Sequence, residues 1–357
     1  DVQDTDAITY ALDVKSAGVD SGLDDTISGD NILLRLNASG EVEGYLENDT
    51  TTVAFLISVD ANTGEVTLAQ NRSVVHDDAT DPVESGASAA ALAAADLVTL
   101  TATATDGDGD TDDATANIGT AFTFEDDGPT VTAEGTVPTL TTDDTDIPDT
   151  TSADFSTIFS AAFGADGFKD SDDNDVQDTD AITYALDVKS AGVDSGLDDT
   201  ISGDNILLRL NASGEVEGYL ENDTTTVAFL ISVDANTGEV TLAQNRSVVH
   251  DDATDPVESG ASAAALAAAD LVTLTATATD GDGDTDDATA NIGTAFTFED
   301  DGPTVTAEGT VPTLTTDDTD IPDTTSADFS TIFSAAFGAD VQGCRRRQCP
   351  GHRCHHL

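Results

Sequence analysis

The chain is poor in several residues that commonly carry chemistry or stiffen a fold. Among its 357 residues there is no Met and no Trp, and aromatic residues make up only 5%. The three cysteines all lie within residues 344–354, so the remainder has neither a disulfide nor a thiol nucleophile. No run of 18 or more apolar residues occurs. The sequence therefore predicts no membrane insertion.

Basic residues are scarce as well. Residues 1–340 contain seven Lys and Arg against 71 Asp and Glu, a formal net charge of −64. Such a charge repels nucleic acid and anionic lipid, which excludes both as partners. The apolar fraction of 38% argues against plain disorder. A compact state must therefore withstand strong self-repulsion with help from cations. Divalent metal is one source, and the high salt of salt-loving organisms is the alternative.

An exact tandem repeat is the main feature of the sequence. Residues 1–166 recur without a difference as residues 175–340, a period of 174. This period is too long for a solenoid unit and suits a whole domain. Since the chain opens inside a repeat and has no Met, we expect it to be a piece of a longer protein. Identical copies indicate that length and spacing matter more than the chemistry of each copy.

The last 17 residues break the repeat. Residues 341–357 read VQGCRRRQCPGHRCHHL, where the first copy has GFKDSDDNDVQDTDAIT. One permitted set of codons for this tail, read one base later, translates as FKDADDDNVQDTDAIT. We therefore interpret residues 341–357 as a frameshifted third repeat that is not native. The Cys and His residues of this tail lack the C-x2-C spacing of common zinc sites. If the tail is frameshifted, they do not form a native metal cluster.

Short alternating strands separated by Gly, Asn and Asp turns predict an all-β fold. Strands are expected at residues 8–15, 32–36, 41–46, 53–59, 65–69, 97–105 and 114–124. Residues 87–97 are expected to form a short Ala-rich helix, and residues 153–163 a helical turn or packed loop. The predicted fold class is tandem Ig-like or cadherin-like β-sandwich domains with acidic loops. The expected domains are residues 1–127, 128–301 and 302–340, joined at DDGPTVT.

Several segments together resemble a known family. DSGLDDTISGDN, LVTLTATATDGDGDT, FTFEDDGP and the ADFS…FGADG segment are similar to the tandem domains of giant repeats-in-toxin (RTX) proteins, which Gram-negative bacteria secrete by type I secretion. The resemblance covers essentially all of residues 1–340. It implies an extracellular or cell-surface, calcium-loaded array in a large adhesin. The glycine-rich nonapeptide of calcium β-rolls and the C-terminal secretion signal are both absent from this sequence.

Acidic loops supply candidate calcium ligands. In DGDGDTDD, Asp alternates with Gly, and Ca²⁺ takes six to eight oxygen ligands that such a loop can provide. An EF-hand is excluded, because Thr111 replaces the required Gly and Asn117 the bidentate Glu. The cluster Glu125–Asp127 precedes the joint, where it could share a cation with the neighbouring repeat. The candidate metal ligands are Asp106, Asp108, Asp110, Asp112, Asp113, Glu125, Asp126, Asp127, Asp280, Asp282, Asp284, Asp286, Asp287, Glu299, Asp300 and Asp301.

The sequence offers little support for a catalytic site. Each repeat holds one His, His76 or His250, and its acidic surroundings in VVHDDATD are expected to form an exposed loop. No P-loop or Rossmann glycine pattern is present. We expect no enzyme. The predicted function is a calcium-rigidified extender whose partners are neighbouring repeats and whose adhesive target lies outside this chain. The alternatives are a passive spacer in a secreted toxin or enzyme and a carbohydrate-binding module, which the absence of Trp weakens.

Overall fold

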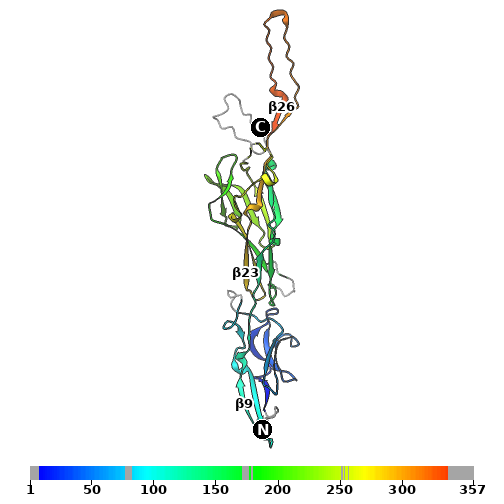
Figure 1. Cartoon of the computed structure of the whole chain (residues 1–357), viewed down its shortest axis with the longest axis vertical. Coiled ribbons are helices and arrows are strands. Elements are labelled where there is room, and N and C mark those ends of the chain that lie inside the picture. The colour runs from blue at the N-terminus through cyan, green and yellow to red at the C-terminus, as the bar shows by residue number, and fades with distance from the viewer. Residues whose placement is uncertain are drawn as a thin grey trace. The chain divides into compact units, whose positions relative to one another are not determined.

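The computed structural model describes residues 8–76, 83–170, 180–250 and 257–336, with residues 177, 252, 254 and 255. Figure 1 traces the chain, which divides into two compact units. Unit 1 comprises Asp1–Ala133, Phe159–Thr183 and Ala276–Ala288. Unit 2 comprises Glu134–Ile158, Tyr184–Thr275 and Thr289–Leu357. The predicted frameshifted tail lies outside the described residues.

The larger sheet of unit 1 is an antiparallel meander. Its strands, in spatial order, are β2 (Val19–Asp24), β3 (Asn31–Leu36), β4 (Val42–Leu46), β5 (Val53–Val59) and β6 (Val66–Gln70). Alternate side chains point to opposite faces of each strand, so Ile32 and Leu34 of β3 are both fully buried. The turn from β3 to β4 uses Gly40 at φ 82°, a conformation that glycine adopts without steric cost.

A second layer of unit 1 consists of β1 (Ile8–Val14), β8 (Val98–Thr105) and β9 (Thr111–Asn117), paired in the order β1-β8-β9. The short strands β7 (Ala90–Ala91) and β10 (Thr123–Phe124) pair with each other. Strand β1 packs against β3, β4 and β5, which makes the unit a sandwich. In its core the rings of Phe55 and Phe124 lie 5.1 Å apart. Strands β11 (Thr130–Ala133) and β14 (Phe159–Ala162) also pair.

Unit 2 repeats the meander in the second sequence copy and extends it by one strand. The order is β13-β20-β19-β18-β17-β16, with β16 (Val193–Asp198), β17 (Asn205–Leu210), β18 (Val216–Leu220), β19 (Asp223–Val233) and β20 (Glu239–Gln244). The added edge strand is β13 (Asp149–Asp154). Strand β12 (Leu140–Asp143) pairs in parallel with β24 (Phe296–Glu299), which also pairs with β21 (Ala264–Ala265).

The remaining pairings complete the described strands. Strands β15 (Ile182–Val188), β22 (Val272–Thr279) and β23 (Thr285–Asn291) form a three-stranded sheet in that order. A hairpin pairs β25 (Thr304–Ala307) with β26 (Phe333–Ala336). No helix among the described residues is long and apolar enough to cross a membrane.

The predicted all-β class of tandem sandwiches is confirmed, whereas some local predictions differ from the structure. Residues 87–97 do not form an Ala-rich helix, because they contain β7 and a single 3-10 turn at Ala95–Leu97. The helical turn predicted within residues 153–163 is present as a short 3-10 turn, but the end of β13 and the whole of β14 flank it. The strand predicted at residues 114–124 is interrupted by a 3-10 turn between β9 and β10. Strand β2 is not among the predicted strands. A register shift between Asp20 and Asp24, with Gly22 at φ 82°, interrupts its regular alternation. The predicted domain boundaries stay predictions.

Candidate metal centre

The two copies of the DGDGD loop have the same sequence and different surroundings. In the turn from β8 to β9, Asp106, Asp108 and Asp110 are all exposed. In the turn from β22 to β23, which belongs to unit 1, Asp280 is fully buried and Asp284 is 3% exposed. Both loops close in the same way, since the first Asp accepts the backbone N–H of the fifth residue at 2.9 and 2.8 Å. The difference therefore arises from packing.

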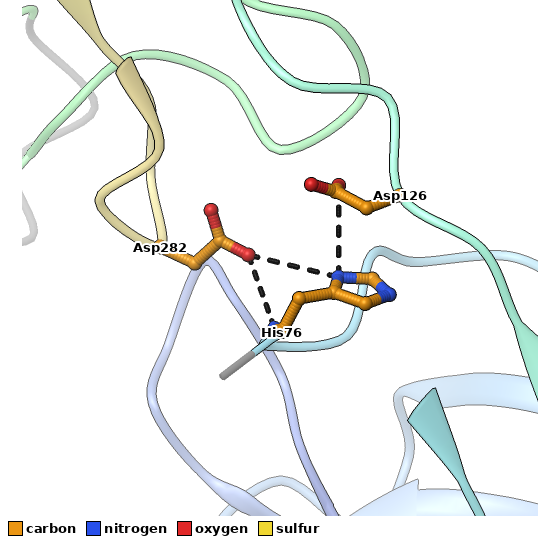
Figure 2. Close-up of side chains that lie close together, drawn as sticks. All are labelled: His76, Asp126 and Asp282. Carbon is orange, nitrogen blue, oxygen red and sulfur yellow. Dashed lines mark hydrogen bonds and ion pairs between the residues drawn. The ribbon is translucent and has the colours of Figure 1, made fainter. Parts of the chain in front are cut away.

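The buried loop meets the acidic exit of the first copy within unit 1. Asp126 is 6% exposed and follows β10. His76 is 8% exposed, so the prediction of an exposed histidine is wrong. Figure 2 shows its Nδ1 atom facing two carboxylates, with the Asp126 Oδ1 atom at 3.6 Å and the Asp282 Oδ2 atom at 3.7 Å. The backbone N–H of His76 also donates to Asp282 Oδ2 at 3.1 Å.

Further acids surround this group. Asp166 is 4% exposed and accepts a hydrogen bond from the Thr26 hydroxyl at 3.4 Å. Glu84 is 1% exposed, and its backbone carbonyl accepts the N–H of Asp126 at 2.9 Å. We call the following residues the junction cluster: Glu84, Asp126, Asp166, Asp280, Asp282 and Asp284, with His76. A cavity of about 400 Å³, lined in part by His76, Asp126 and Asp166, opens beside it.

Several buried atoms of the junction cluster lack a hydrogen-bond partner within the part of the chain that the structure describes. These atoms are His76 Nδ1, both carboxylate oxygens of Asp126, Asp280 Oδ2, Asp282 Oδ1 and Asp284 Oδ2. A buried charged oxygen without a donor or counter-ion costs considerable free energy. Among the described residues, these atoms are therefore left for protons, water or a cation to satisfy.

Burial and the crowding of carboxylates raise the pKa values of several acids in the junction cluster. Burial, followed by the neighbouring carboxylates of Asp284 and Asp166, raises the pKa of Asp126 to about 8. Burial and the carboxylates of Asp282 and Asp284 raise the pKa of Asp280 to about 7. Burial also raises the pKa of Asp284. At neutral pH the metal-free cluster therefore takes up protons or repels itself.

His76 supplies the one positive charge in the group. Burial opposes its protonation, but Asp282, the Phe124 carbonyl and Asp126 outweigh burial and raise its pKa to about 9. Its Nε2 atom lies 3.2 Å from the Phe124 carbonyl oxygen, so this nitrogen donates. A neutral ring would then turn the Nδ1 lone pair toward two carboxylates. An imidazolium, a bound cation or a proton on the facing Asp126 carboxyl removes that conflict.

The chemistry of the donor set fits a hard divalent cation. Asp280, Asp282 and Asp284 each present an oxygen, and these three atoms lie within 4.8 Å of one another. Asp126 and Asp166 form a second close group with Asp127, which is itself exposed. Carboxylate oxygens gathered from several segments are the ligands that Ca²⁺ prefers. Sequence reasoning missed His76, Glu84 and Asp166 because nothing local indicates that they meet across the fold.

Other predicted ligands have different surroundings. Asp112, Asp113 and Asp287 lie exposed on β9 and β23. Asp286 accepts the backbone N–H of Val131 at 2.7 Å. Glu125 and Glu299 accept the backbone N–H groups of Gly86 and Gly260, at 3.1 and 2.8 Å, and so hold a turn in each copy.

Unit 2 contains a smaller version of the histidine group. His250 Nε2 lies 3.0 Å from the Phe298 carbonyl oxygen, and Nδ1 lies 3.9 Å from Asp300 Oδ1. The third member is Asp144, which is fully buried and accepts the backbone N–H of Asp301 at 3.0 Å. Asp300 and Asp301 of the predicted exit cluster thus lie close to Asp144, which belongs to an acidic segment far away along the chain.

Comparison with known proteins places the chain in a family. Residues 1–119 and 139–293 match the model described as Domain of unknown function (DUF5801), and the chain belongs to this family. No curated protein matches. A structure titled "Protocadherin Gamma B2 extracellular cadherin domains 3-6" is similar at 12% identity and a TM-score of 0.23. The match covers 86% of this chain and 55% of that one.

Proposed function

We propose that these domains are calcium-binding extender modules of a large secreted or cell-surface bacterial adhesin, with a structural and non-catalytic role. The observation that carries the proposal is the junction cluster, in which buried oxygens of Asp126, Asp280, Asp282 and Asp284 lack donors among the described residues. The cluster joins the exit of one sequence copy to the hairpin loop of the next. A cation held there ties successive repeats together.

The charge of the chain supports this role. Carboxylates without counter-ions repel one another and disfavour the folded state, as the raised pKa values of Asp126 and Asp280 express. Calcium binding neutralises the cluster, and because a preformed site rarely exists in an unfolded chain, metal binding and folding are coupled. Extracellular modules bind Ca²⁺ at about 10⁻⁴–10⁻³ M. Such a chain stays expanded where calcium is scarce and folds where calcium is plentiful.

Thermal unfolding of the full chain, followed by circular dichroism, tests the proposal. The midpoint is measured in chelator, in millimolar calcium, and in sodium chloride of matched ionic strength. We expect a rise of many degrees with calcium alone. An equal effect of sodium chloride would contradict calcium ligation and favour the alternative that the acids are simply solvated in high salt.

The repeat provides a matched control. Asp282→Asn with Asp284→Asn removes ligands from the buried loop, whereas Asp108→Asn with Asp110→Asn makes the same change in the exposed loop. The first variant should lose most of the calcium-dependent rise and the second should keep it. Equal losses in both would show that the junction cluster is not the site.

A further inference from the structure

Three side chains of unit 2 that can bind a metal meet at one end of the β12–β24 pair. The two strands run parallel and stay in register to their last residues. Because parallel strands end at the same edge of a sheet, the residues that follow them, Asp144 and Asp300, lie side by side. The His250 ring reaches them from the segment after β20. We call these three residues the His250 group. All three belong to unit 2 and lie within one period of the repeat.

The orientation of the His250 ring is fixed by the backbone. Its Nε2 atom lies 3.0 Å from the carbonyl oxygen of Phe298 in β24, to which this nitrogen donates. The lone pair of a neutral ring is then on Nδ1, which faces the Asp300 carboxylate. A histidine that donates one ring nitrogen to a carbonyl and turns the other toward acidic groups has the arrangement usual for a metal ligand.

The Nδ1 atom of His250 is buried and has no hydrogen-bond partner among the described residues. The side chain as a whole is 5% exposed. One ring nitrogen of His250, one oxygen of Asp144 and one oxygen of Asp300 lie within 4.8 Å of one another. A buried polar atom aimed into such a set of acceptors indicates that a ligand belongs between them.

The spacing of the group suits an ion better than direct contact. A hydrogen bond between an imidazolium and a carboxylate has a length of about 2.7–2.9 Å. The His250 Nδ1 atom lies 3.9 Å from Asp300 Oδ1. Two atoms that share one zinc-sized ion, at about 2.0–2.2 Å each, are separated by at most about 4.4 Å. Asp144 is fully buried, and its Oδ1 atom accepts the backbone N–H of Asp301 at 3.0 Å, which orients the carboxylate.

We propose that Asp144, His250 and Asp300 bind a first-row transition-metal dication such as Zn²⁺, at a site separate from the junction cluster. Calcium and magnesium take oxygen ligands, whereas an imidazole nitrogen suits zinc and its neighbours in the first row. The bound ion ties the segment that carries His250 to the ends of β12 and β24 and so stiffens unit 2. This site does not depend on whether the junction cluster of unit 1 binds calcium.

Zinc binding by the full-length chain tests the proposal, provided that the C-terminal tail cannot compete. Thiols and imidazoles bind the same metals, so every sample carries Ser at six positions of the tail. The replaced residues are Cys344, Cys349, His352, Cys354, His355 and His356. Zinc is titrated by calorimetry in the presence of millimolar calcium, which occupies sites made of oxygen alone. We expect one equivalent of zinc to bind at the His250 group under these conditions.

Asp144→Asn and His250→Gln should each weaken that binding by at least about 100-fold, since the loss of a residue that only orients a ligand already costs about 10–100-fold. The Asn keeps the shape of the side chain, and the Gln keeps an N–H donor for the Phe298 carbonyl. Asp143→Asn is the matched control and should bind zinc as before. Asp143 is exposed, and it caps a short turn in a way that Asn also can.

Nitrogen NMR of the histidine rings provides a second test, which needs no variant of the site to fold. With the tail replaced, only His76 and His250 remain. Zinc should shift the Nδ1 resonance of His250, while Nε2 stays protonated. A His250 ring that does not respond to zinc, zinc binding that survives both substitutions, or displacement of the zinc by millimolar calcium would overturn the proposal. None of these outcomes bears on the calcium-dependent unfolding midpoint, which tests the junction cluster alone.

Discussion

Arg72 and Asp25 form a two-pronged ion pair at the edge of the unit 1 meander. Arg72 Nε donates to Asp25 Oδ1 at 2.6 Å, and a terminal nitrogen donates to Oδ2 at 2.7 Å. Asp25 is fully buried. Arg246 and Asp199 repeat the pair in unit 2 at 2.7 and 2.8 Å. In a chain with so few cations, these arginines anchor the loop after β2 and its counterpart after β16.

Asp25→Asn should therefore destabilise the fold. Breaking a fully buried pair costs about 3–5 kcal/mol. Because the Arg72 side chain is 25% exposed, we expect about 2–3 kcal/mol here. Urea unfolding measures the change. The exposed pair of Lys15 and Asp96 serves as the control, and Asp96→Asn should change the free energy of unfolding by less than about 1 kcal/mol. Equal losses of unfolding free energy in the two variants would show that the buried ion pair does not stabilise the fold more than an exposed one.

Close packing makes Gly44 and Gly218 intolerant of a side chain. A Cβ atom on Gly44 would lie 2.3 Å from the Phe55 ring, and one on Gly218 would lie 2.4 Å from the Phe229 ring. Gly44→Ala should cost about 1–3 kcal/mol, the usual range for overpacking a core. Gly107→Ala is the matched control, since no atom lies within 4 Å of its Cβ position. Thermal unfolding compares the two, and a neutral Gly44→Ala would contradict the packing.

Stability without metal should fall as the pH rises toward 9. The pKa values of Asp126 and Asp280 are raised from 3.8 to about 8 and about 7, chiefly by burial. The pKa of His76 is raised from 6.5 to about 9 by Asp282 and other acceptors that outweigh burial. All three groups bind protons more tightly in the folded state. Their contribution to the free energy of unfolding is thus complete below the pKa values of the unfolded state. It is lost as the pH rises through the pKa values of the folded state.

Calcium should reverse this trend near neutral pH, because a bound cation replaces the protons. Unfolding midpoints between about pH 5 and pH 9, in chelator and in calcium, provide the comparison. Asp25 and Asp199 affect stability in a different pH range. Burial would raise their pKa values, but hydrogen bonds from the arginines and from Ser28 or Ser202 outweigh burial and lower them. Their contribution to the free energy of unfolding is therefore lost only in acid. A flat metal-free profile between neutral and pH 9 would contradict the crowded cluster.

Local pattern was sufficient for most of the long strands of unit 1 and insufficient for the candidate site. Alternation and turn residues predicted β1, β3, β4, β5, β6 and β8, since those signals act within a few residues. The DGDGD sequence indicated a cation loop, but it could not distinguish the exposed Asp106 from the fully buried Asp280, which has the same neighbours in sequence. Burial of that loop depends on Asp126 and His76, far away along the chain. Long-range packing decides which copy of the loop is buried.

The same principle makes identical substitutions unequal in residues 134–158 and 308–332, which have the same sequence. Phe155 is fully buried and stacks on Phe296, whereas Phe329 is 37% exposed. Phe155→Ala should destabilise unit 2 by about 3–5 kcal/mol, because it removes a large side chain and leaves a cavity. Phe329→Ala should change the free energy of unfolding by less than about 1 kcal/mol, because its side chain is not packed in the core. Urea unfolding compares the two variants. If Phe329→Ala destabilised the chain as much as Phe155→Ala, residues 308–332 would have to be packed in solution as residues 134–158 are.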